Sequence, residues 1–225
     1  MRYYPAFLDL AAKRCLVAGA GSVGRRKAAT ILACSPASVL LVDPGPAHPE
    51  LDELLANPVL SFENRPFQDQ DLSGVFLAVA ATADSAVNER IALLCREKSI
   101  LCNVIDAPDL GDFIVPSSMD LGDLVVALST SGQSPALTRL LRQDLQEYLG
   151  SRYTKLLAFM GRLRPMVLAQ EAGSVDHAAL FRSLADSGLA RMMAEDDAAG
   201  TRELLARLLP PQLRTRMEEL LHGLV

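Results

Sequence analysis

The chain has 225 residues, of which 50% are hydrophobic and 22% charged, and its formal net charge is −5. This composition is typical of a globular protein that buries a substantial core, and the negative charge argues against non-specific nucleic-acid binding. No apolar stretch approaches the roughly 18 residues that span a bilayer, and no secretory apolar core follows Met1, so we expect a cytoplasmic protein without a membrane segment.

The first predicted element is a buried strand over residues 14–18. Residues 3–10 before it form an apolar lead-in that we expect to pack beside the strand. The run Cys15-Leu16-Val17-Ala18 is continuously apolar, as in a parallel strand that is covered on both faces. The strand leads into Gly19-Ala20-Gly21-Ser22-Val23-Gly24, a GxGxxG sequence, and a predicted helix runs from Ser22 to about Ala33.

Each glycine of this sequence has a different role in a dinucleotide site. Gly19 permits a sharp turn, Gly21 lets the backbone approach a pyrophosphate, and Gly24 lets the helix pack closely on the strand. The helix start at Ser22 and Val23 offers N–H groups and a partial positive charge to the phosphates. A purely structural glycine turn is the alternative, but the strand before it and the helix after it favour dinucleotide binding.

The next predicted strand, residues 38–42, ends in an acidic residue. This residue, Asp43, lies 19 positions beyond Gly24. A carboxylate at this spacing holds the ribose 2′-OH of NAD and repels the 2′-phosphate of NADP. The sequence therefore predicts NAD as the cofactor.

Further strands continue the parallel sheet. We predict them at residues 59–62, 75–80 and 100–104, with helices at 50–56 and 86–98. The loops after the last two strands carry Thr82, Asn103 and Asp106 to the sheet edge where ligands of doubly wound folds bind.

These three side chains are candidate site residues. Thr82 and Asn103 are predicted to contact the cofactor; for the Thr82 loop the alternative is that Asp84 or Ser85 simply caps the following helix. Asp106 is a candidate proton acceptor, and the alternative is that it caps a turn made with Pro108.

After the sheet the pattern changes to a hairpin and then to helices. Extended runs at residues 112–116 and 123–128 predict a hairpin whose exposed edge could pair with a second copy. A helix is predicted from Pro135 to about Tyr148, with Ser134 as its cap, and further helices follow from residue 151. We expect these to be broken near Gly173, Gly188, Gly200 and Pro210-Pro211.

The predicted fold class is therefore α/β. It comprises a Rossmann-like NAD-binding domain at residues 1–112, a dimerisation and substrate-loop segment at 113–150 and a helical domain at 151–225. No metal site is predicted, because the three histidines fall in unrelated regions and the four cysteines form no C-x-x-C pair.

The chain resembles the precorrin-2 dehydrogenases of siroheme biosynthesis, which include the amino-terminal part of fused siroheme synthases. The resemblance covers roughly residues 3–150 and consists of short motifs in the family's order and spacing. They are residues 4–10 (YPAFLDL), 19–24 (GAGSVG) with Arg26-Lys27, 80–82 (AAT) with Asp84, 103–108 (NVIDAP), 113–116 (FIVP) and 131–136 (SGQSPA).

The resemblance implies an activity and further site residues. It implies NAD-dependent oxidation of precorrin-2 to sirohydrochlorin by a homodimer, with Asp106 as the functional aspartate, and in some members also insertion of iron or cobalt. The substrate loop would be Ser129-Thr130-Ser131-Gly132. Candidate partners of the substrate's carboxylate arms are Arg25, Arg26, Lys27, Arg139 and Arg142.

Two other functions fit part of the sequence. An unrelated NAD-dependent dehydrogenase would use the same glycine turn, but it gives no reason for the 103–108 stretch. A non-catalytic NAD-sensing module would use the turn and Asp43, but it leaves Asp106 and the hydroxyl-rich loop without a role.

Overall fold

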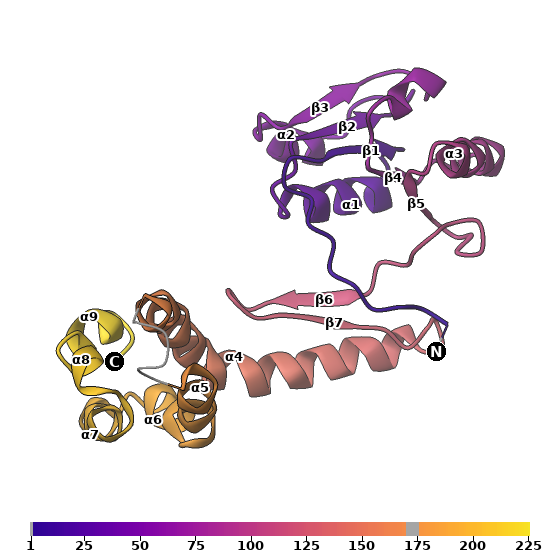
Figure 1. Cartoon of the computed structure of the whole chain (residues 1–225). Helices are drawn as coiled ribbons and strands as arrows, with labels where there is room; N and C mark the ends of the chain where they lie inside the picture. The colour runs from indigo at the N-terminus through magenta and orange to yellow at the C-terminus, as the bar shows by residue number, and fades with distance from the viewer. Residues whose placement is uncertain (1, 170–175) are drawn as a thin grey trace. The chain divides into compact units, whose positions relative to one another are not determined.

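The computed structural model describes residues 2–169 and 176–225. The chain forms two compact units, Met1–Val115 and Pro116–Val225 (Figure 1). The division into three parts at residues 112 and 150 stays a prediction. In the part of the chain that is described, no helix is long and apolar enough to cross a membrane.

The first unit is built around a parallel sheet of five strands. The strands are β1 (Arg14–Ala18), β2 (Ser38–Val42), β3 (Leu60–Glu63), β4 (Leu77–Ala80) and β5 (Leu101–Val104). They lie in the order β3-β2-β1-β4-β5. The chain therefore proceeds from β1 through β2 to β3 at one edge, and then returns to the other side of β1 to form β4 and β5. The predicted Rossmann-like sheet is confirmed.

Helices cover both faces of this sheet. They are α1 (Ser22–Leu32), α2 (Glu50–Leu55) and α3 (Ser85–Glu97), with a short 3₁₀ helix, η1 (Asp69–Leu72). Alternate residues of β1 join different cores: Cys15 and Val17 pack with α1 and α2, whereas Leu16 and Ala18 pack with α3. A strand with a core on each face has no polar side, which explains its continuous apolar run.

The lead-in before β1 does not pack as expected. Leu10 is buried, but Tyr4 and Phe7 are 89% and 73% exposed. The described residues before β1 form no strand, and the one bridge near them pairs Ala11 with Pro36. Without a ladder of hydrogen bonds, most of this apolar segment is not held against the sheet.

The second unit begins with a hairpin whose first strand differs from the prediction. The antiparallel strands are β6 (Ser117–Asp120) and β7 (Val125–Leu128). The expected strand at 112–116 is wrong, because this segment is bound to β5 instead. The Asp112 N–H donates to the Cys102 carbonyl (2.8 Å), and Oδ2 of Asp112 accepts from the Cys102 N–H (2.9 Å).

The rest of the second unit is helical. Its elements are α4 (Pro135–Leu168), α5 (His177–Asp186), α6 (Leu189–Ala194), α7 (Ala198–Leu208), α8 (Pro211–Arg214) and α9 (Met217–Leu221). The cap at Ser134 is confirmed by its hydrogen bond from the Leu137 N–H (3.2 Å), but α4 continues 20 residues past Tyr148. Phe159, Leu163 and Val167 of α4 are fully buried in the core that the later helices share.

The predicted helix breaks have mixed outcomes. Gly188 caps α6, and Pro210 separates α7 from α8, as expected. Gly200 lies inside the first turn of α7, where its N–H donates to the Asp197 side chain, and the break falls just before it, at residues 195–197. Gly173 lies outside the described residues.

Candidate dinucleotide and active site

The glycine turn between β1 and α1 has the geometry of a phosphate-binding loop. Gly19 has a φ of +105°, and a Cβ there would lie 2.3 Å from the Ala81 carbonyl oxygen. A Cβ on Gly24 would lie 1.8 Å from the Gly19 oxygen, whereas a Cβ on Gly21 would meet no neighbouring atom within 4 Å. Gly19 and Gly24 are therefore required by packing, and Gly21 leaves open space beside the start of α1.

The peptide groups of this turn are held from two sides. The Ala20 N–H donates to Oδ2 of Asp43 (2.6 Å), and Nη1 of Arg25 donates to the Ala20 carbonyl (2.7 Å). Oδ1 of Asp43 accepts from the Gly45 N–H (2.6 Å). A carboxylate has about four acceptor positions, so Asp43 can still bind ribose hydroxyls.

Arg25 has a different role from the one expected of it. We predicted it as a partner of substrate carboxylates, but its side chain is only 11% exposed and also pairs with Glu50 (2.8 Å). Arg25 therefore stabilises the glycine turn. Of the other two cations, Arg26 is exposed, and Lys27 is half-buried, where desolvation followed by repulsion from Arg26 lowers its pKa.

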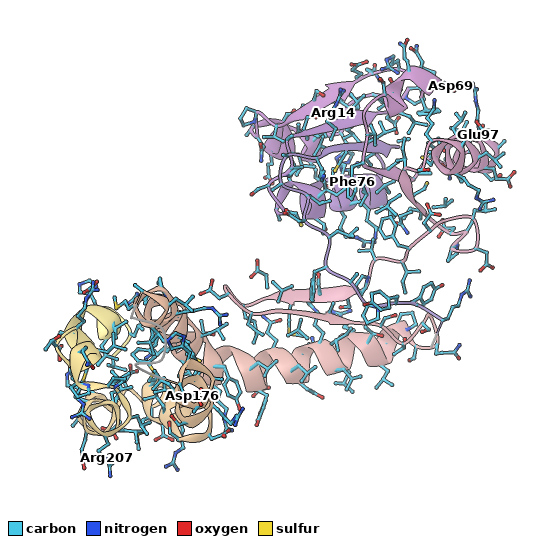
Figure 2. The ribbon with its side chains drawn as sticks, viewed as in Figure 1. Arg14, Asp69, Phe76, Glu97, Asp176 and Arg207 are labelled. Carbon is cyan, nitrogen blue, oxygen red and sulfur yellow. The ribbon has the colours of Figure 1, made fainter. Side chains whose placement is uncertain are left out.

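A cavity of about 370 Å³ begins at Asp43 and extends to α3. Pro66 and Phe67, from the connection between β3 and η1, line it together with Arg90 of α3. Asp69 of η1 holds Arg90 in place, since both its carboxylate oxygens accept from Nη2 (2.7 and 2.9 Å; Figure 2 labels Asp69). The remaining lining residues are Ala18, Val42, Asp43, Pro44, Thr82, Ala83, Asp84 and Val87.

The connection that carries Pro66 and Phe67 is fixed by a buried ion pair. Nη2 and Nη1 of Arg65 donate to Oδ1 and Oδ2 of Asp71 (2.7 and 2.9 Å), and the Gln68 N–H donates to Oδ2 (2.8 Å). Asp71 is only 7% exposed. Burial opposes its charge, but these hydrogen bonds outweigh burial and lower the pKa of Asp71.

We expect Asp71→Asn to lower the free energy of unfolding by about 2 kcal/mol at neutral pH, because it leaves Arg65 without its buried partner. A lowered folded-state pKa stabilises the fold above the unfolded-state pKa of about 3.9, and this contribution is lost as the pH falls below it. The difference between wild type and variant should therefore shrink below about pH 4. Urea unfolding followed by circular dichroism at several pH values checks this; an equal difference at every pH would contradict it.

A smaller cavity of about 170 Å³ contains Asp106. Thr82 and Ala83 line both cavities, so one loop separates them. Asp106 is exposed and has a φ of +63°, in the left-handed region that aspartate tolerates better than most residues. Among the described residues its carboxylate accepts no hydrogen bond, so Asp106 does not cap the turn with Pro108.

The structure also places the other predicted cofactor contacts. Asp84 caps α3, accepting from the N–H groups of Ala86 (2.9 Å) and Val87 (3.4 Å), which confirms the predicted cap; the contact of Thr82 with the cofactor stays a prediction. Asn103 does not line either cavity. It is 6% exposed, and its Nδ2 donates to the Phe113 carbonyl (3.0 Å), which helps to bind the 112–113 segment to β5.

The predicted substrate loop belongs to the second unit. Its hydroxyls shape the loop: Oγ of Ser129 accepts from the Ser131 N–H (3.0 Å), and Oγ1 of Thr130 accepts from the Ser134 N–H (3.1 Å). Ser131 and Gly132 both have positive φ values, +53° and +83°, and form a tight turn at the loop tip. Arg139 is exposed on α4.

Known proteins resemble the chain in both units. Residues 6–117 match a family model described as "Putative NAD(P)-binding", and residues 122–148 match one described as "Sirohaem biosynthesis protein central". The siroheme synthase of Citrobacter koseri is 33% identical over 224 residues, which cover 99% of this chain and 49% of the relative. That of Nitrosospira multiformis is 39% identical over 170 residues, 74% of this chain and 36% of the relative.

A solved structure agrees with these sequence matches. The protein described as "SirC, precorrin-2 dehydrogenase" superposes with a TM-score of 0.74 at 25% identity, covering 92% of this chain and 98% of its own. The chain spans about half the length of the Citrobacter siroheme synthase. In sequence and in fold, the chain is thus similar to siroheme synthases and to a precorrin-2 dehydrogenase.

Proposed function

We propose that this chain catalyses the NAD-dependent oxidation of precorrin-2 to sirohydrochlorin. The observation that carries the proposal is the position of Asp106 in a cavity that shares the Thr82-Ala83 wall with the dinucleotide cavity. Hydride removal and proton removal must occur close together. In this arrangement, only the loop of Thr82 and Ala83 separates the cavity of the carboxylate from the proposed cofactor site. The likeness to a precorrin-2 dehydrogenase structure supports the substrate.

Different residues of the first unit would bind the pyrophosphate, bind the ribose and accept the proton. The open space at Gly21 and the N–H groups at the start of α1 would hold the pyrophosphate, and Asp43 would hold the adenosine ribose. Bound NAD would accept the hydride from the tetrapyrrole. Asp106 would accept the proton that leaves the substrate, because it lines the second cavity and its carboxylate accepts no hydrogen bond among the described residues.

An absorbance assay tests the proposal. Precorrin-2 and NAD are supplied under anaerobic conditions, and we expect one NADH for each sirohydrochlorin formed. NAD binding without turnover would instead favour the NAD-sensing module. Adding ferrous or cobaltous ion after the reaction tests metal insertion, which we propose as a separate activity and which a lack of any metallated product would rule out.

We propose a homodimer that forms through the second unit. Three leucines on α4 support it, since Leu137, Leu140 and Leu141 are 47%, 53% and 40% exposed, and Val125 of β7 is 47% exposed. Leucine stripes of this kind normally face another surface. We also propose a cytoplasmic location, supported by four free cysteines of which three are buried.

Replacing one of these leucines should separate the dimer. We expect Leu140→Glu to raise the dimer dissociation constant about 30-fold or more, because it places a charge in the apolar contact. Gln143→Glu, on the same exposed stretch of α4, adds a charge without removing a leucine and is the control. Sedimentation velocity measures both; a dimer of unchanged strength in Leu140→Glu would show that this face is not the interface.

A further inference from the structure

The loop between β4 and α3 rests directly on the glycine turn. The Ala81 N–H donates to the Ala18 carbonyl (2.8 Å), and a Cβ on Gly19 would lie 2.8 Å from the Thr82 nitrogen. The loop therefore lies between β1 and β4, where the strand order reverses and where ligands of such sheets bind. Any shift of the Thr82 peptide moves the wall of both cavities.

One side chain of α3 holds this peptide. Asn88 is 7% exposed, and its Oδ1 accepts from the Thr82 N–H (3.1 Å) while its Nδ2 donates to the Thr82 carbonyl (3.1 Å). A single carboxamide thus satisfies both backbone groups of one residue. Only one orientation of the amide can do this. In the reversed orientation, the NH₂ group would face the Thr82 N–H and the amide oxygen would face the Thr82 carbonyl oxygen, so neither hydrogen bond could form.

Asn88 also takes part in binding the Thr82 hydroxyl. Oγ1 of Thr82 lies 2.8 Å from Oδ1 of Asn88 and 2.9 Å from the Asp84 carbonyl, and it accepts from the Asp84 N–H (3.2 Å). A hydroxyl has one proton to donate, and the two acceptors within reach of it, the Asp84 carbonyl and Oδ1 of Asn88, both belong to the protein. Thr82 therefore contributes its position and shape to the cavities, and its proton stays within the loop.

We propose that Asn88 is a positioning residue of the dinucleotide site, which fixes the Thr82 peptide and hydroxyl and through them the loop that the cofactor contacts. The proposal rests on the proposed NAD-dependent function. Asn88 need not touch the cofactor for this role, because the Thr82 loop transmits its effect.

The substitution Asn88→Asp gives a test that depends on protonation. A neutral Asp at this position can donate its O–H to the Thr82 carbonyl, as Nδ2 does now, whereas an ionised Asp would repel that carbonyl. Burial raises the pKa of a carboxyl group above its usual value of about 3.9. We therefore expect the dissociation constant of the variant for NAD, relative to wild type, to rise about tenfold between about pH 5 and about pH 8.

A matched exchange elsewhere in the unit is the control. Asn57 accepts from the Val59 N–H (3.0 Å) in the turn before β3, and Asn57→Asp keeps that bond. Its NAD affinity should follow wild type at every pH. Asp84, Glu89 and Asp106 are the carboxyl groups around Asn88, and both variants retain them.

NAD binding is measured by titration calorimetry on the full chain, without tetrapyrrole. A ratio to wild type that stays constant with pH in Asn88→Asp would overturn the positioning role and leave the proposed function intact. If Asn88→Asp fails to fold at the higher pH, Asn88→Ala carries the test: we expect about tenfold weaker NAD binding at both pH values, and unchanged binding would overturn the proposal. A wild type that binds no NAD would overturn both this inference and the proposed function.

Discussion

Asp106→Asn should lower the turnover of precorrin-2 by about 10²- to 10⁴-fold, the usual contribution of a positioned acid or base. The amide cannot accept the substrate's proton. Asparagine tolerates the left-handed backbone that Asp106 adopts (φ +63°) about as well as aspartate does, so the loop should keep its shape. NAD affinity should be unchanged, because Asp106 does not line the dinucleotide cavity.

Turnover and NAD binding are measured on the same preparation. Asp109→Asn is the control, because it makes the same exchange three residues further along. There it removes only the exposed ion pair with Arg2, and such a pair contributes about 0–1 kcal/mol. Turnover of Asp106→Asn at the wild-type rate would show that the proton leaves by another route.

Alanine at Gly21 and alanine at Gly24 should have different effects on the same site. The Cβ of Gly24→Ala would lie 1.8 Å from the Gly19 oxygen, so α1 must move away from the turn. We expect a loss of about 1–3 kcal/mol in the free energy of unfolding, together with loss of NAD binding. Gly21→Ala meets no neighbouring atom within 4 Å and has an extended backbone, so stability should not change.

Gly21→Ala should nevertheless prevent NAD from binding, because its methyl group occupies the space left for the pyrophosphate. Thermal unfolding and NAD titration of the two variants separate the effects. If Gly21→Ala binds NAD as wild type does, the phosphates do not lie on this turn.

The sheet and its glycine turn could be predicted because local patterns encode them. Five short apolar runs gave the strands, and the glycine spacing together with Asp43 indicated a dinucleotide site. The prediction of a hairpin strand at 112–116 was wrong, because an extended apolar run does not show which strand it will contact. Gly111 lets the chain approach β5, where a Cβ would lie 2.9 Å from the Cys102 oxygen, and Asp112 then completes the attachment.

The residues that complete the site come together only in the folded chain. Phe67 lies in the connection between β3 and η1, and Arg90 lies on α3. No periodic pattern in the sequence shows that these two residues line one cavity. Asn88 did leave a signal. It lies on the stripe of α3 that also buries Ile91, Ala92 and Cys95, and a polar residue on such a stripe needs a partner. The roles predicted for Asp106 and for the Ser129–Gly132 loop rested chiefly on the family resemblance, since single polar residues in loops have no periodic pattern.

A crystal structure of the chain with NAD tests the central claim most directly. We predict that the pyrophosphate lies against Gly21 and the N–H groups of Ser22 and Val23, that the adenosine ribose is bound by Asp43, and that the nicotinamide faces the cavity of Asp106. A cofactor bound away from the glycine turn, or a nicotinamide that faces away from Asp106, would contradict this account.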